Sequence, residues 1–316
     1  MWCLFGIGMK GDVSMNMWMA KKWINYMNRM TEMAFKWEKP PKNIHILENI
    51  SYIEDGTEQH KLDILYPDIK QELYPVIVNI HGGAFCMNSK DNIYRNYGIR
   101  LAGNKYAVVN INYRLSLDAV FPAQVEDVIS AIHFIWKNAD MYHLDRERLF
   151  VSGDSAGAYL AAMAGCVSSH KRLQKYYGWN TDIHIRGLGL CCGMYDFESY
   201  LKTKVIFPLK RTSTWLLFGT KDITKADAFT YSSVLKHINE NFPPTYIMET
   251  EMNSFVEEAL RMEKILKKKN VAYKIHIYPK KDKLMHAFHV MDHYKEGDEV
   301  LKEMWDFLAT GSSTRR

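Results

Sequence analysis

Short apolar runs alternate with longer amphipathic segments along most of this 316-residue chain. The runs are rich in β-branched and aromatic residues, which is typical of buried strands, whereas the longer segments repeat apolar residues at helical spacing. This alternation predicts an α/β fold, with a mostly parallel central sheet of about eight strands flanked by helices on both faces. Strands are expected at residues 44–53, 60–67, 75–83, 106–113, 146–153, 185–192, 214–219, 244–249 and 272–279, and helices at 122–139, 156–165, 254–269 and 299–309.

The first amphipathic segment differs from the others in its content of methionine and tryptophan. It spans residues 14–37 and ends before Pro40 and Pro41, which do not continue a helix. Two interpretations stay open: a helix docked on the core, or a movable lid, because methionine and aromatic side chains form an adaptable surface over an apolar ligand. The apolar residues at helical spacing are Met15, Trp18, Met19, Trp23, Tyr26, Met27, Met30, Met33, Ala34 and Trp37.

Charge and cysteine content restrict the function further. The formal net charge is +5, but Lys and Arg are interleaved with Asp and Glu, so we expect no nucleic-acid partner. The five cysteines lack metal-site spacing and indicate a reduced, cytoplasmic protein without a metal. The opening residues are a poor signal peptide and no stretch approaches a membrane span, so we expect no stable membrane insertion.

A serine between two glycines marks the candidate chemistry. In the sequence GDSAG (153–157), Ser155 lies between a strand-like run and an alanine-rich helical run. The flanking glycines, Gly153 and Gly157, permit a sharp turn that exposes the serine hydroxyl, and the Ala156 amide at the helix start faces the atom that the hydroxyl attacks. The alternative is a glycine-flanked serine that only caps a helix.

A serine nucleophile also needs donors for an oxyanion. Gly82 and Gly83 follow a predicted strand in the sequence NIHGGAF, and without side chains they can turn their amides toward one point. A glycine pair at an ordinary strand exit is the alternative.

Three segments together resemble the hormone-sensitive-lipase-like branch of the α/β-hydrolase esterases: HGGAF (81–85), NYRLSLDAVFPAQVEDV (112–128) and GDSAG (153–157). The resemblance extends from about residue 60 to the last helix and implies an α/β-hydrolase fold. It implies an oxyanion hole formed by the amides of Gly82, Gly83, Ala84 and Ala156. Ala84 stands where the family usually has a third glycine, but alanine retains the backbone N–H.

The resemblance also implies the base. The family places it in an H-x-F setting between the last strand and the last helix, which His286 fits in the sequence LMHAFHV. A neutral imidazole there can accept the Ser155 proton and then protonate the leaving alcohol.

The acid position departs from the family pattern. Where similar esterases carry an aspartate, this chain aligns best with Asn253, which has no charge to stabilise an imidazolium. Glu251 is the substitute considered. Three outcomes remain open: a slow enzyme, rescue by Glu251, or an inactivated variant.

The sequence therefore predicts a helical cap or lid at residues 1–41, an α/β-hydrolase catalytic domain at 42–310 and a disordered tail at 311–316. The predicted function is a carboxylic ester hydrolase that acts through an acyl-serine intermediate. The resemblance implies small esters with short acyl chains, of the acetyl and butyryl type, and no cofactor. A triad-impaired homologue that binds a small ligand and an amide or formamide hydrolase are the alternatives, and a homodimer is compatible with the sequence.

Overall fold

The computed structural model describes residues 17–35, 44–103, 105–203, 210–252 and 254–311, and its central element is an eight-stranded sheet. The strand order is β1-β2-β4-β3-β5-β6-β7-β8. The pairs β1–β2 and β2–β4 are antiparallel, and every later pair is parallel, which confirms the predicted α/β-hydrolase class with its mostly parallel sheet. The strands are β1 (Ile46–Ser51), β2 (Lys61–Leu65), β3 (Tyr74–Ile80), β4 (Ala107–Ile111), β5 (Leu144–Asp154), β6 (Ile185–Cys191), β7 (Thr245–Thr250) and β8 (Tyr273–Tyr278).

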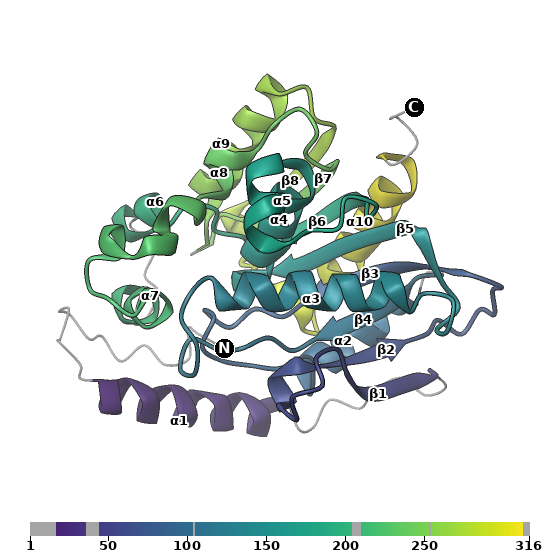
Figure 1. Ribbon diagram of the computed structural model, residues 1–316, viewed down its shortest axis with the longest axis horizontal. Helices are drawn as coiled ribbons and strands as arrows, with labels where there is room; N and C mark the ends of the chain where they lie inside the picture. Colours follow the sequence, from purple (N-terminus) through teal and green to yellow (C-terminus); the bar gives the residue numbers. More distant parts are fainter. Residues whose placement is uncertain (1–16, 36–43, 104, 204–209, 253, 312–316) are drawn as a thin grey trace.

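Helices cover both faces of this sheet (Figure 1). The helices predicted at 14–37, 122–139, 156–165, 254–269 and 299–309 are present with small shifts at their ends, whereas the other helices were not predicted. They are α1 (Met17–Phe35), α2 (Ile93–Ala102), α3 (Ala123–Lys137), α4 (Ala156–Ser169), α5 (Lys171–Tyr177), α6 (Phe197–Lys202), α7 (Lys210–Phe218), α8 (Val234–His237), α9 (Val256–Lys268) and α10 (Lys295–Gly311).

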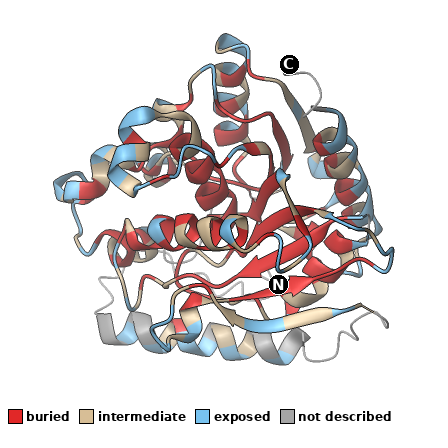
Figure 2. Cartoon of the chain, turned by 45° about the vertical axis from the view of Figure 1, so that its right-hand side comes forward, coloured by how far each residue is buried: buried red, intermediate tan, exposed pale blue. Residues whose placement is uncertain are grey.

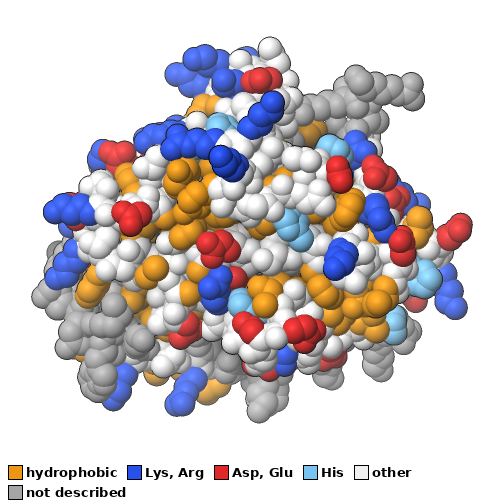
Figure 3. Space-filling view, viewed as in Figure 1, with side chains coloured by type: hydrophobic (Ala, Val, Ile, Leu, Met, Phe, Trp, Pro, Cys, Tyr) orange, Lys and Arg blue, Asp and Glu red, His pale blue; other side chains and the backbone are white. Residues whose placement is uncertain are grey.

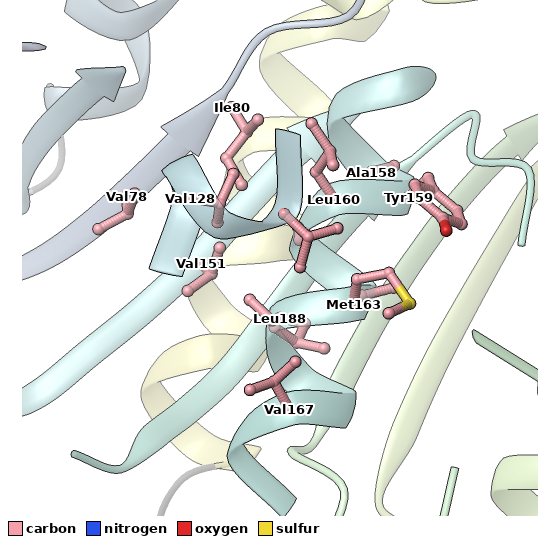
Figure 4. Packing of buried hydrophobic residues seen from close by; sticks show 14 of the residues in the cluster. Val78, Ile80, Val128, Val151, Ala158, Tyr159, Leu160, Met163, Val167 and Leu188 are labelled. Atoms are coloured by element: carbon pink, nitrogen blue, oxygen red, sulfur yellow. The ribbon is translucent and has the colours of Figure 1, made fainter. Parts of the chain in front are cut away.

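Alternation along the inner strands divides the core into two layers. Val76, Val78 and Ile80 of β3 pack in the cluster that contains α3, α4 and α9, whereas Ile77 between them packs in the cluster that contains α2 and α10. Figure 4 shows the first layer, where side chains of α4 lie against those of β3, β5 and β6. Because both faces are covered, the central strands are largely buried, including the carboxyl-terminal half of β5 (Figure 2). Their carboxyl ends form one edge, where a site is expected.

One predicted strand is wrong. The run TWLLFG (214–219) is largely helical, because residues up to Phe218 belong to α7. A short apolar run does not distinguish a strand from a buried helix. Leu217 and Phe218 join the main core, while Leu216 faces a separate small cluster, so the segment is apolar because it is buried between two surfaces.

The N-terminal helix contacts the rest of the chain only partly through the predicted apolar stripe. Ile24 of α1, outside that stripe, is 1% exposed and packs with Cys86, Met87 and Leu216. Trp23 of the stripe packs against the same cluster, whereas Met19 and Met33 are exposed. Met15 and Trp37 lie outside the described residues, as does the predicted tail beyond Gly311. In the described ranges, no helix has the length and apolar character needed to cross a membrane. Figure 3 shows basic and acidic side chains interspersed on the viewed face.

Candidate active site

Ser155 occupies the sharp turn between β5 and α4, as predicted. Its backbone has φ 53° and ψ −115°, which is a strained conformation for a residue with a side chain. The Ser155 N–H donates to the Cys191 carbonyl at 2.9 Å, which ties the turn to the end of β6. A Cβ on Gly157 would overlap the Ile80 carbonyl oxygen, and one on Gly153 would overlap the Gly157 backbone. Both positions therefore require glycine, because any side chain would collide with neighbouring backbone atoms.

His286 meets this serine from the segment between β8 and α10. Its Nε2 lies 3.0 Å from the Ser155 Oγ, within reach for proton transfer. The ring stacks edge-on against Phe255, with centroids 5.2 Å apart. Burial lowers the pKa of His286 to about 3, so the free enzyme holds a neutral imidazole at neutral pH.

Ser254 and Glu249 lie behind the imidazole. The Ser254 Oγ is 2.8 Å from His286 Nδ1, and it also donates a hydrogen bond to Glu249 Oε1. Glu249 belongs to β7, in which all six residues are buried, and burial raises its pKa to about 7. The sequence prediction missed both residues. An acidic residue near the carboxyl end of a buried strand is the signal that could have identified Glu249.

Two residues, Asn253 and Glu251, were considered for the acid position, and the structure describes only the second. Asn253 lies outside the described residues, so its predicted role stays a prediction. Glu251 is exposed, and its carboxylate accepts a hydrogen bond from the Lys280 backbone N–H at 2.9 Å. The structure does not support Glu251 as the residue that orients His286, because its carboxylate is engaged at the surface.

The predicted oxyanion residues separate into two groups. The Gly82 N–H donates to Asp154 Oδ1 and to the Tyr94 hydroxyl, both at 3.0 Å. The prediction that this amide belongs to the oxyanion hole is therefore wrong: it holds the loop instead. Gly83 has φ 121° and Ala84 has φ 52°, so the chain turns sharply after this anchor.

Ala84 and Ala156 line a pocket together with Ser155, which suits their predicted role as amide donors beside the nucleophile. The pocket is small, with a cavity volume of about 20 Å³. Residues of helices α6 and α7 also line this pocket. Its further lining residues are Phe85, Met194, Phe197, Tyr200, Ser213, Thr214 and Phe255.

Asp154 holds the loop after β3 in place. Its second carboxylate oxygen accepts a hydrogen bond from the Tyr94 hydroxyl at 3.0 Å. This one side chain therefore connects β5, α2 and the loop after β3. Burial raises the pKa of Asp154 to about 7. Next to it, the His81 ring stacks on Tyr113 with centroids 4.3 Å apart. These contacts fix the backbone from which Gly83 and Ala84 project.

The fold and the site define an α/β-hydrolase of the esterase type. A family model described as BD-FAE matches residues 62–266, about two thirds of the sequence, and the chain belongs to this family.

Similar proteins agree with this assignment. Versiconal hemiacetal acetate esterase of Dothistroma septosporum is 24% identical over 246 residues, which cover 73% of each chain. Esterase LipQ of Mycobacterium tuberculosis is 25% identical over 207 residues, which cover 65% of this chain and 48% of LipQ. The structure of esterase B from Lactobacillus rhamnosis matches with a TM-score of 0.82 and 22% identity, covering 94% of this chain and 96% of that one. The two curated esterases support carboxylic ester hydrolase activity, and the structural match shows the shared fold.

Proposed function

We propose that this protein hydrolyses small carboxylic esters through an acyl-serine intermediate. The observation that carries the proposal is the 3.0 Å contact between the half-buried turn hydroxyl of Ser155 and the neutral imidazole of His286. His286 Nε2 takes the hydroxyl proton as Oγ bonds to the ester carbonyl carbon, and it returns that proton to the departing alcohol. His286 Nε2 then takes a proton from water as the water oxygen bonds to the acyl carbon, and it returns that proton to Ser155 Oγ as the carboxylic acid departs.

The amides of Gly83, Ala84 and Ala156 are proposed to stabilise the oxyanion that develops on the carbonyl oxygen. Ala84 and Ala156 flank Ser155 in the same pocket, and the N-terminus of α4 favours negative charge there. Gly82 is excluded from this set, because its N–H is bound to Asp154 and Tyr94.

A short acyl chain suits the pocket best. The pocket is lined by Phe197, Tyr200 and Phe255, and its cavity volume of only about 20 Å³ favours short acyl chains over long ones. Among the relatives, one is named as an acetate esterase, and esterase B was crystallised with a tributyrin phosphonate inhibitor. We propose acetyl and butyryl esters as the preferred substrates.

The test is hydrolysis of p-nitrophenyl acetate, butyrate and octanoate by the wild type and Ser155→Ala. We expect activity that falls with chain length, and a loss of about 10⁴-fold or more in Ser155→Ala. Ser130→Ala, which removes a hydroxyl that bonds only within α3, is the matched control and retains full activity. Hydrolysis that persists in Ser155→Ala contradicts the proposed mechanism. A folded wild type that binds esters without cleaving them favours a ligand-binding protein, and faster cleavage of p-nitroanilides favours an amide hydrolase.

A further inference from the structure

The carboxyl group of Glu249 lies in an unusual place for an acid. Every residue of β7 is buried, and Glu249 itself is 0% exposed. An ionised carboxylate in such surroundings costs several kcal/mol unless hydrogen bonds compensate it. The compensation comes from the Thr250 N–H at 2.9 Å and from the Ser254 hydroxyl, both of which donate to Oε1.

The hydrogen bonds of this group determine which nitrogen of His286 carries the proton. An ionised carboxylate only accepts, so Ser254 must give its single hydroxyl proton to Glu249. The Ser254 oxygen can then only accept from His286 Nδ1, 2.8 Å away, which places the ring proton on Nδ1. Nε2 is left with a lone pair directed at the Ser155 hydroxyl.

We propose that Glu249, acting through Ser254, is a positioning residue that sets the tautomer of His286 and stabilises the imidazolium formed during catalysis. The inference rests on the proposed function. Asparagine stands at residue 253, where the resemblance to related esterases leads one to expect the acid, and it brings no charge. Glu249 brings that charge to the ring through one hydroxyl group.

The buried surroundings of His286 make such a charge necessary. Burial opposes protonation of this ring, so the imidazolium that forms when Ser155 loses its proton needs a nearby anion. Glu249 is separated from the ring by a single side chain, and the hydroxyl between them transmits the interaction as two aligned hydrogen bonds.

The proposal predicts a pH dependence with a definite sign. Burial raises the pKa of Glu249 to about 7. Below this pH, a protonated Glu249 can donate to Ser254, which can then donate to Nδ1 and move the ring proton to Nε2. Catalytic efficiency should therefore rise as the pH increases through about 7.

The other titratable groups around Glu249 are distinguishable from it. Burial raises the pKa values of Cys191, Cys192 and Tyr195 well above their usual range, so all three stay neutral near pH 7. His286 is neutral there as well. Asp154, which adjoins Ser155 in the chain, also has its pKa raised to about 7, so it requires a control variant.

The experiment measures kcat and KM on p-nitrophenyl butyrate from pH 5 to 9 for the wild type, Glu249→Gln and Asp154→Asn. Both variants are isosteric and remove one ionisable group. Glu249→Gln should lower kcat by about 10²-fold at pH 8 with little change in KM, and it should lose the rise near pH 7. Asp154→Asn should retain that rise. A Glu249→Gln enzyme with the wild-type rate and pH profile overturns the proposal.

Ser254 provides the second, independent test. Ser254→Ala should lower kcat as Glu249→Gln does, the double variant should be no worse than either single one, and Ser254→Thr, which restores a hydroxyl, should recover activity. Additive losses contradict a shared path. Asn253→Asp should change turnover by less than about tenfold, because the charge is already supplied. A gain of 10²-fold or more would identify a missing acid at residue 253 and overturn the role of Glu249. A wild type without esterase activity is a failure of the proposed function instead.

Discussion

Two buried carboxylates support the Ser155–His286 pair in different ways: Asp154 adjoins Ser155 in the chain, and Glu249 contacts His286 through Ser254. Burial raises the pKa of each to about 7. Asp154 binds a backbone amide and a tyrosine hydroxyl, so it fixes the shape of the loop that carries Ala84. Glu249 binds the hydroxyl that contacts the imidazole. Similar pKa values therefore do not imply equal roles: the turn side of the site depends on geometry, and the imidazole side depends on charge.

The strongest test of the geometric side adds one methyl group. In Gly157→Ala the new Cβ would overlap the carbonyl oxygens of Ile80 and His81, which are backbone atoms that cannot move aside cheaply. We expect a loss of about 3 kcal/mol or more in unfolding free energy, together with nearly all activity. Urea unfolding followed by circular dichroism measures the first, and butyrate hydrolysis the second. Gly178→Ala is the control: a Cβ there meets no atom within 4 Å, so only the left-handed backbone at φ 64° should cost about 1 kcal/mol, with activity retained.

An intermediate effect is expected when Asp154 loses its hydrogen bonds, and a smaller one when it loses only its charge. Asp154→Leu loses both hydrogen bonds, to Gly82 and Tyr94, and should lower kcat by about 10²-fold or more as the oxyanion amides shift. In Asp154→Asn the side-chain oxygen can accept from the Gly82 N–H and the side-chain nitrogen can donate to the Tyr94 hydroxyl, so this variant should remain within about tenfold of the wild type. If the asparagine variant is as inactive as the leucine variant, charge matters on both sides and the comparison fails.

Asp154 should also contribute a pH-dependent component to stability. Its folded pKa of about 7 exceeds the usual value of 3.8, so the folded state keeps a proton that the unfolded state releases between these pH values. This contribution to the free energy of unfolding is present at low pH and is lost as the pH rises to about 7. The drop in stability from pH 5 to pH 8 should therefore be smaller in Asp154→Asn than in the wild type, measured by urea unfolding. An unchanged drop would show that Asp154 is ionised throughout.

The difference between the turn side and the imidazole side of the site also explains which site residues the sequence could predict. Ser155 and its glycines lie within five consecutive residues, so local sterics alone predict the strand, the sharp turn and the helix. His286 was predicted from the resemblance and meets Ser155 in the structure. Ser254 and Glu249 were missed because their role depends on which side chains meet after β7 and β8 pair side by side, and spacing along the chain does not show this.

Local sequence patterns also gave wrong predictions where a contact with a distant part of the chain determines the structure. Gly82 was assigned to the oxyanion hole because glycine frees the backbone, yet the buried carboxylate of Asp154 takes its amide. The helix α7 was predicted as a strand because it is apolar toward both the core and Ile24. In both cases a tertiary contact decided the outcome.

The smallest expected effect concerns α1, which packs on the segment after the oxyanion turn. Ile24→Ala removes the buried contact with Cys86, Met87 and Leu216, at a local cost of about 2 kcal/mol. We expect faster hydrogen exchange in α1 and a changed ratio of butyrate to octanoate hydrolysis, with little change in melting temperature. Met33→Ala, at a position that is 62% exposed, is the control and should change none of these. A large drop in melting temperature with unaltered chain preference would favour a docked core helix over a lid.

The acylation of Ser155 is the central claim, and covalent labelling tests it most directly. Wild-type protein treated with a p-nitrophenyl alkylphosphonate carrying a butyl chain should gain one adduct, which peptide mass spectrometry should locate on Ser155. His286→Ala should label far more slowly, and Ser155→Ala should not label at all. An adduct on another residue, or a folded wild type that remains unlabelled, would contradict the account.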